Sequence, residues 1–282
     1  MQNAAGPGPA TLGPSAFLTV DPYVVPDNAT AAAPLLTPMQ PDGTSQLEAN
    51  DARFSALVYS VNGVLYAVHS TELSNRIAIR WYRIRAADSV LLESGTIADT
   101  NLDLFFPSIA ANTNGTVVIG CNGSSSNTYV SSFAFVGQTI NGVTTFGSPI
   151  LLYSGTTSYH GDDEALAGQS RWGDYSATSV DPSDPSRFWT IQIVPVDVNV
   201  WSTQITELRA SPTLLAINRQ NPGQLQIIWS TAAAGYQLQS TTSLVSPAAW
   251  SNVTQTPLTN GYRISVNLPD SIGTQFFRLK KL

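Results

Sequence analysis

Two hairpin signals with the same dipeptide constrain the fold of this chain more than any other feature. Asn62-Gly63 and Asn114-Gly115 lie 52 residues apart, and each separates two runs of β-branched and aromatic residues. Asn-Gly readily supplies the two positive φ angles of a tight hairpin, so matching copies predict matching hairpins. Units of about 50 residues with three or four strands are typical of β-propeller blades. We therefore predict an all-β fold made of repeated antiparallel sheets.

The repeated unit occurs three times between residues 51 and 210. In the first copy the strand-like runs are Phe54–Tyr59, Val64–Val68 and Ile77–Tyr82. In the second copy they are Pro107–Ala111, Thr116–Ile119 and Tyr129–Phe135. In the third copy they are Tyr175–Val180, Phe188–Ile193 and Val200–Ile205, with a turn at Asp181–Pro185. We expect the three turns to occupy equivalent places in successive four-stranded sheets.

Three copies are fewer than the four or more blades of a closed propeller. The sequence therefore predicts incomplete β-propeller-like repeats, three to four blades, over residues 51–210. Residues 1–50 are rich in Pro, Ala and Gly, which indicates an extended segment with one strand candidate at Ala16–Val20. Either this segment supplies part of a fourth blade, or upstream blades are absent from this sequence.

A different pattern occupies residues 213–282, after a boundary at Arg209–Pro212. Its strand-like runs are Leu214–Asn218, Gln224–Ser230, Tyr236–Ser240, Trp250–Val253, Tyr262–Leu268 and Phe276–Leu279. Six or seven short strands with Trp229 as the core candidate predict a small β-sandwich. It resembles the fibronectin type III or immunoglobulin-like modules that close many secreted bacterial proteins.

The third copy also resembles a known family. Arg171–Ile191, followed by Trp201–Ile205, is similar to a signature in secreted bacterial proteins of the sialidase-like propeller superfamily, and Asn75–Ile84 fits the same group. The resemblance covers roughly residues 50–208 and implies the architecture. The superfamily's Asp-box, Ser-x-Asp-x-Gly-x-x-Trp, does not occur in the sequence, so no catalytic residue is carried over from it.

The charge distribution and the composition limit the classes of partner that the protein can bind. Residues 1–213 hold eight Arg and eighteen acidic residues, a net charge of -10, whereas residues 214–282 carry +4. Nucleic-acid binding needs clustered Lys and Arg, so the acidic body argues against it. No stretch approaches the 18 apolar residues of a membrane span. Because charged residues make up only 11% and hydroxyl and amide groups are abundant, we expect an extracellular or cell-surface protein whose signal peptide is missing from this sequence.

The ligand-binding candidates lie at the start of the third copy. Arg171, Trp172, Asp174 and Tyr175 open a strand, and strand starts of propellers lie near the central axis where ligands bind. Arg171 could clamp an anionic group and Asp174 could face a ligand. The structural alternative is an Arg-Asp pair that joins adjacent blades, with Trp172 as packing. Cys121, His69 and His160 have no partners at catalytic or metal-ligand spacing, so we expect a buried thiol at Cys121 and a structural role for His69.

Two functions remain open. The first is a binding or adhesion protein that presents a propeller face to a glycan or a surface protein, with the C-terminal module as spacer or attachment. The second is a partial or divergent glycoside hydrolase of the sialidase type, for which Asp174, Tyr175 and Arg171 are weak catalytic candidates among the arginines Arg53, Arg76, Arg80, Arg171 and Arg187. No cofactor is required by either, and unpaired blade edges predict self-association.

The densest acidic run is a candidate calcium site. Asp162, Asp163 and Glu164 are consecutive, with His160 before them and Asp174 as a further ligand candidate. Carboxylate oxygens are the ligands that Ca²⁺ prefers. The alternative is a solvated acidic loop, because the spacing matches no EF-hand.

Calcium should raise the melting temperature if the acidic run binds it, because a cation relieves the repulsion among the three carboxylates. At a calcium concentration about a thousandfold above the Kd of the site, binding stabilises the fold by about 4 kcal/mol. Thermal melts with calcium and with a chelator measure the effect. Coincident curves would reject the site and leave Arg171 as the counter-charge of these carboxylates.

Overall fold

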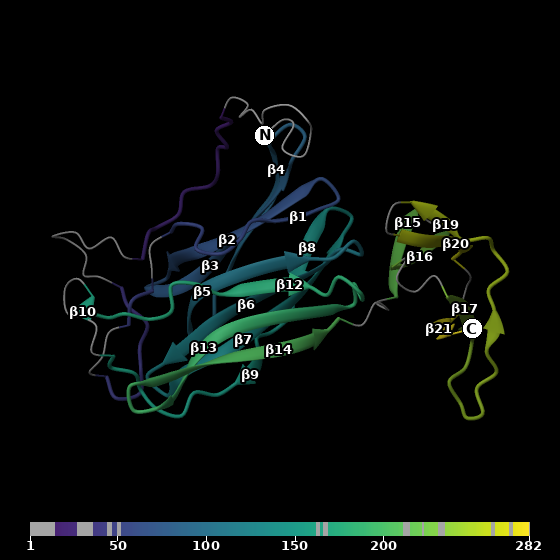
Figure 1. Cartoon of the computed structure of the whole chain (residues 1–282). Coiled ribbons are helices and arrows are strands. Elements are labelled where there is room, and N and C mark those ends of the chain that lie inside the picture. Colours follow the sequence, from purple (N-terminus) through teal and green to yellow (C-terminus); the bar gives the residue numbers. More distant parts are fainter. Residues whose placement is uncertain are drawn as a thin grey trace.

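The computed structural model describes residues 15–26, 36–43, 47–49, 52–161, 164–165, 169–210, 215–221, 223–230, 235–260, 263–270 and 273–281. These residues form 21 strands and no helix, in several small antiparallel sheets, none of which closes on itself (Figure 1). The all-β prediction is confirmed. The described part of the chain holds no helix with the length and apolarity to cross a bilayer.

Three sheets follow one another along residues 59–209, and the strands of each are joined in chain order. The first sheet has the order β1-β2-β3-β4, with bounds Tyr59–Val61, Val64–Leu73, Arg76–Arg85 and Val90–Ile97. The second has the order β5-β6-β7-β8, with bounds Asp103–Ala111, Thr116–Ser125, Thr128–Ile140 and Val143–Phe146, and β9, Ile150–Tyr153, also pairs with β7. The third has the order β12-β13-β14, with bounds Ala177–Val180, Arg187–Asp197 and Val200–Arg209.

The three predicted turns each join the first and second strands of a sheet, although the third sheet has three strands instead of four. Asn62 and Gly63 have φ angles of 55° and 72°, as a tight hairpin requires. At the second turn only Gly115 has a positive φ, 81°. There the side-chain oxygen of Asn112 accepts the N–H groups of Asn114 and Thr116, both at 2.9 Å, so a longer loop replaces the expected two-residue turn.

The start of the chain differs from its prediction. The strand candidate Ala16–Val20 is not a strand, and a single bridge joins Val24 to Glu72 instead. The run Phe54–Tyr59 contributes only its last residue to β1. Phe54 is instead turned onto the outer face of the first sheet, where its ring lies 5.7 Å from that of His69.

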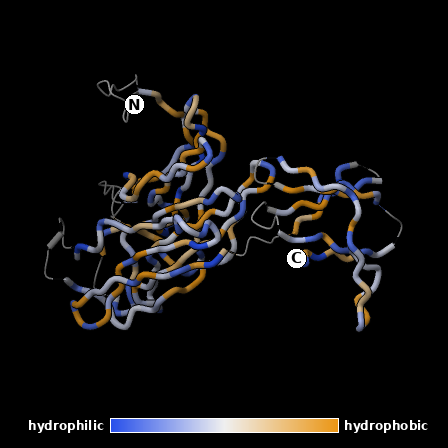
Figure 2. Tube along the Cα trace, turned by 45° about the vertical axis from the view of Figure 1, so that its right-hand side comes forward, coloured by the Kyte–Doolittle hydropathy of each residue, from blue (hydrophilic) through white to orange (hydrophobic). Residues whose placement is uncertain are grey.

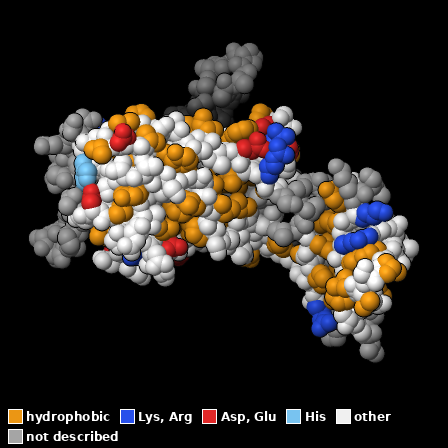
Figure 3. Space-filling model, turned by 90° about the horizontal axis from the view of Figure 1, so that it is seen from below, with side chains coloured by type: hydrophobic (Ala, Val, Ile, Leu, Met, Phe, Trp, Pro, Cys, Tyr) orange, Lys and Arg blue, Asp and Glu red, His pale blue; other side chains and the backbone are white. Residues whose placement is uncertain are grey.

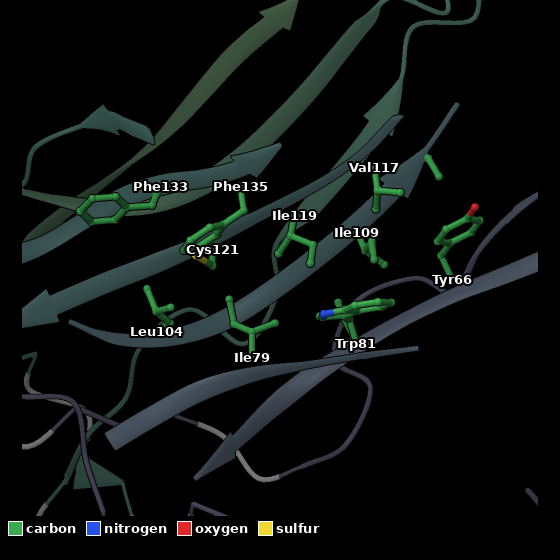
Figure 4. Close-up of a cluster of buried hydrophobic side chains, with 12 residues drawn as sticks. Tyr66, Ile79, Trp81, Leu104, Ile109, Val117, Ile119, Cys121, Phe133 and Phe135 are labelled. Carbon is green, nitrogen blue, oxygen red and sulfur yellow. The ribbon is translucent and has the colours of Figure 1, made fainter. Parts of the chain in front are cut away.

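The second sheet lies between the other two and is buried on both faces. Every residue of β5 and β6 is buried, while β2 and β3 pack on β5 from one side and β12 and β13 pack on β5, β6 and β7 from the other. The first interface is apolar (Figure 4). Its core residues are Tyr66, Val68, Ile79, Trp81, Leu104, Ile109, Ala111, Val117, Ile119, Cys121, Phe133 and Phe135. Cys121 is buried, as predicted, and burial raises the pKa of its thiol.

The interface between the second and third sheets is partly polar. Ser108 shares a hydrogen bond with Thr178 at 2.8 Å, and Thr178 shares another with Thr190 at 3.0 Å. Gln192 donates to Thr190 at 2.6 Å. Gly120 of β6 faces this network, where a Cβ would lie 2.1 Å from the Thr190 hydroxyl. Absence of a side chain at this position therefore lets the two sheets approach.

Residues 215–281 form two further sheets around one core. The first has the order β15-β16-β20-β19, with bounds Ala216–Asn221, Gln224–Ser230, Arg263–Pro269 and Leu258–Asn260. The second has the order β18-β17-β21, with bounds Ser251–Asn252, Tyr236–Thr241 and Phe276–Lys281. Trp229, predicted as a core residue, is buried with Ile227, Leu238 and Val266. Figure 2 shows hydrophobic and hydrophilic residues mixed along the strands of this unit and of the body.

Gly120→Ala should destabilise the fold by about 1–3 kcal/mol, because the added methyl group overlaps the hydroxyl of Thr190 and the amide of Gln192. Urea denaturation measures the change. Gly147→Ala is the matched control, since its Cβ would meet only a carbonyl oxygen at 3.6 Å. Equal stability of the two variants would show that the interface adapts without cost.

Candidate functional site

The predicted ligand residues lie on the loop between β11, Gln169–Ser170, and β12. Trp172 anchors this loop, because its side chain is buried and its indole Nε1 donates to the side-chain oxygen of Asn122 at 3.1 Å. The amide nitrogen of Asn122 donates in turn to the carbonyl of Ile193 at 2.8 Å. The ring of Tyr159 meets Trp172 edge to face, with centroids 4.9 Å apart. The loop is therefore fixed to the second and third sheets.

Backbone contacts hold both ends of the same loop. The N–H of Glu48 donates to the carbonyl of Ser170 at 2.9 Å, and Leu47 forms a parallel bridge with Ser170. At the other end the Ser176 hydroxyl donates to the Phe106 carbonyl at 2.7 Å. Gly173 lies so close to β13 that a Cβ would stand 2.4 Å from the Ile193 side chain. A larger residue at this position would displace the loop.

An ion pair stands at the exposed side of the loop. A guanidinium nitrogen of Arg171 lies 3.0 Å from a carboxylate oxygen of Asp174, and these side chains are 56% and 42% exposed. Tyr175 is 74% exposed beside them. The structure thus brings Arg171, Asp174 and Tyr175 together at the surface, whereas Trp172 is a packing residue. The ion pair lies within one loop, so it does not join adjacent sheets as the structural alternative supposed.

Two hollows flank this ion pair and share it as a common wall. The first has a volume of about 190 Å³ and is lined by Tyr159, Arg171, Trp172, Gly173, Asp174, Ile193 and Trp201. The second has a volume of about 360 Å³ and is lined by Glu48, Arg53, Phe54, Ser55, Arg171, Asp174 and Tyr175. Sequence reasoning missed the contributions of Glu48, Phe54 and Trp201. The wide spacing of these residues in the chain gave no signal for them.

The acidic run is described only at Glu164, and there only for the backbone. Asp162 and Asp163 lie outside the described residues, and Glu164 is placed only by the pairing of its backbone with Ser170 in the two-stranded sheet of β10, Glu164–Ala165, and β11. Within the described ranges, no group of three or more His, Cys, Asp or Glu residues is placed to hold a metal ion. The calcium site therefore stays a prediction.

His160 makes contacts of its own before this run. Its Nε2 atom lies 2.6 Å from a carboxylate oxygen of Asp42, and its backbone N–H donates to the side-chain oxygen of Asn199 at 3.0 Å. The His160 side chain therefore connects the segment before β10 to the segment around Asp42.

A sialidase would need several arginines at one site. The five candidate arginines are instead distributed over residues 51–210. Arg76 lies 3.6 Å from Asp103, Arg80 lies 3.0 Å from Asp21, and Arg187 lies 3.0 Å from Asp184. Arg53 and Arg171 both line the second hollow. The carboxylate of Asp174 accepts a hydrogen bond from Arg171 at 3.0 Å.

His69 occupies the outer face of the first sheet and is 2% exposed. Its Nδ1–H donates to the carbonyl of Ser70 at 2.7 Å, and its Nε2 atom accepts from the Tyr82 hydroxyl at 2.9 Å. The rings of Tyr23 and Phe54 cover it at 4.8 and 5.7 Å. Burial lowers the pKa of the imidazole, and the charge of Arg80 nearby lowers it further, although the hydrogen bond to Ser70 opposes this. His69 is neutral at pH 7 and holds the N-terminal segment.

Two comparisons relate the chain to known proteins. A scan against protein-family models finds no match, and a search of curated proteins also finds no match.

The fold should lose stability as the pH falls below about 6.5, the ordinary pKa of histidine in the unfolded chain. Below this pH the imidazole of His69 binds a proton in the unfolded chain, whereas its lowered pKa disfavours protonation in the folded state. Each pH unit between the unfolded and folded pKa values costs up to about 1.4 kcal/mol.

Denaturation at pH 7.5 and 5.5 tests this through His69→Gln. The variant removes the titration, so its loss of stability between the two pH values should be smaller than that of the parent protein. An identical pH response of the parent and His69→Gln would contradict the assignment.

Proposed function

We propose that the chain is an extracellular or cell-surface binding protein that presents the loop of Arg171, Asp174 and Tyr175 to a glycan. The observation that supports this is the exposed Arg171–Asp174 pair between two exposed aromatic side chains, Tyr175 at 74% and Trp201 at 55%. A free aromatic ring offers an apolar face for the C–H groups of a sugar ring. A guanidinium and a carboxylate side by side offer fixed donors and acceptors for hydroxyl groups.

The shape of the site also favours an extended ligand. Enclosed small-molecule pockets usually have volumes of about 300–1,000 Å³ and bury most of their ligand. Here two hollows of about 190 and 360 Å³ lie on either side of one ion pair and include exposed side chains. A chain of sugars could lie across the pair and occupy both. The anchoring of Trp172 to Asn122 keeps the loop in place without a ligand, which lowers the entropy lost on binding.

The architecture is part of the same proposal. Three antiparallel sheets that follow in chain order and pack face to face favour a partial sialidase-like propeller. The two small sheets around Trp229 favour an immunoglobulin or fibronectin III-like module that acts as spacer or attachment. Binding is favoured over hydrolysis because the Asp174 carboxylate is 3.0 Å from Arg171 and the Tyr175 side chain is mostly solvated.

Arg171→Gln and Tyr175→Ala should each weaken glycan binding about tenfold, the equivalent of about 1.4 kcal/mol. A glycan array identifies a ligand for the parent chain, and calorimetry measures the affinities. Tyr153→Ala on β9 is the matched control, because this tyrosine is 40% exposed and lines neither hollow.

Two outcomes would overturn the proposal. One is unchanged affinity of both loop variants for the ligand of the parent chain. The other is turnover of chromogenic glycosides that disappears with Asp174→Asn, which would favour the hydrolase instead.

A further inference from the structure

Strand β14 forms a long, exposed edge of the third sheet. It has ten residues, pairs with β13 on one side, and no described strand pairs with its other side. Its first four residues are all exposed, and it contains no proline or lysine. An edge of this kind presents unpaired N–H and C=O groups to any strand that can approach it.

The other edges of the described sheets are short, covered or charged. Strands β1, β8, β9, β10, β11, β12, β18 and β19 have two to four residues each, and β5 is buried throughout. Strand β15 carries Arg219 and a register shift between Arg219 and Asn221. Strand β4 is interrupted by a register shift opposite Arg83, and its Glu93 points inward onto that arginine at 2.7 Å. Strand β21 carries Lys280 and Lys281. Bulges, inward charges and lysines are the usual protection of an edge. Strand β14 has no lysine, and the register shift of its pair with β13, between Pro195 and Asp197, places the extra residue on β13.

The side chains of β14 add apolar surface to this edge. Trp201 and Ile205 are 55% and 60% exposed and, four residues apart, lie on the same face of the sheet. Opposite them on β13 are Pro195 and Ile191. Figure 3, which views the side of the body where β14 and β9 lie in Figure 1, shows mainly hydrophobic and uncharged side chains there, with charged ones toward the margins.

We propose that two copies of this chain associate through β14, as antiparallel neighbours in one continuous six-stranded sheet with Ile205 opposite Ile205. A two-fold axis through such a pair keeps the outer faces of both sheets on the same side, so odd-numbered residues face odd-numbered residues. Trp201 of one copy then lies opposite Arg209 of the second copy, and Thr203 opposite Glu207. The pairing satisfies the free backbone groups of both strands.

Charge complementarity selects this register and a second copy as the occupant. The Arg209 side chain is 68% exposed and can stack its guanidinium on the exposed indole of Trp201 of the second copy. No like charges face each other. A shift by two residues would place Glu207 opposite Trp201 instead, where the negative face of the indole repels a carboxylate. Trp201 also lines the first hollow of the proposed glycan site, whereas Arg171 and Tyr175 do not lie on β14. Arg171→Gln and Tyr175→Ala therefore test glycan binding without changing the proposed dimer edge.

Disulfide trapping tests the register. Ile205→Cys should cross-link into a dimer under mild air oxidation, because the two sulfur atoms meet at the axis, and the native Cys121 is buried and does not compete. Thr203→Cys is the control on the same strand. Its two copies would be offset by four residues, about 13 Å, which is too far for a disulfide. Cross-linking of Thr203→Cys as readily as Ile205→Cys would overturn the register.

Sedimentation velocity at several concentrations tests the association itself. The parent chain should dimerise, and Ile205→Lys should raise the dimer dissociation constant at least tenfold because it places two ammonium groups opposite each other. Val143→Lys carries the same added charge on a side chain that is also 60% exposed, and it should dimerise like the parent. A parent chain that is monomeric at all concentrations, or an Ile205→Lys variant that still dimerises like the parent, would overturn the proposal.

Discussion

Burial of the second sheet on both faces is the constraint on which the rest of the structure depends. β5 and β6 have no solvent-facing residue, so their side chains must suit two neighbours at once. Towards the first sheet β6 presents Val117, Ile119 and Cys121 to an apolar core. Towards the third sheet it presents Gly120 to hydroxyl and amide groups. The first contact gains its stability from apolar burial. The second combines apolar burial of Val118 and Phe188 with the hydrogen bonds among the hydroxyl and amide groups.

The same buried strand fixes the candidate site. Asn122 belongs to β6, and its side chain joins the Trp172 indole to the backbone of β13. If this hydrogen bond broke, the amide and the indole N–H would stay buried without a partner, which costs the free energy of their desolvation. The pair therefore holds the loop in place. Arg171 and Asp174, on either side of Trp172, can then remain exposed and still keep fixed positions. Rigidity comes from the core, and the polar chemistry stays at the surface.

The sequence was informative where the signal is local. Alternating runs and turn dipeptides predicted most strands of the body and of residues 215–281, and the Asn62-Gly63 hairpin has the expected φ angles. The second turn differs because the Asn112 side chain caps it, which an Asn-Gly dipeptide does not reveal. At the candidate site, the sequence singled out the residues of one loop but not the distant residues Glu48, Phe54 and Trp201, which line the same hollows. Trp172 lies on a loop, where its contact with Asn122 buries it, whereas Trp201 lies on the edge strand β14 and is exposed. Burial at both positions depends on residues far away in the sequence.

A stack of sheets that does not close ends in two outer faces, and this chain treats them differently. The outer face of the first sheet is covered by the chain's own N-terminal residues, where Tyr23 packs on His69 and Asp21 pairs with Arg80. The outer face of the third sheet keeps Trp201 and Ile205 exposed. Further along the chain, Leu47 and Ala49 pack with Trp172 and with Ile193 of β13, but Trp201 and Ile205 stay exposed. A partner that covers Trp201 and Ile205 would therefore gain buried apolar area at this end of the stack.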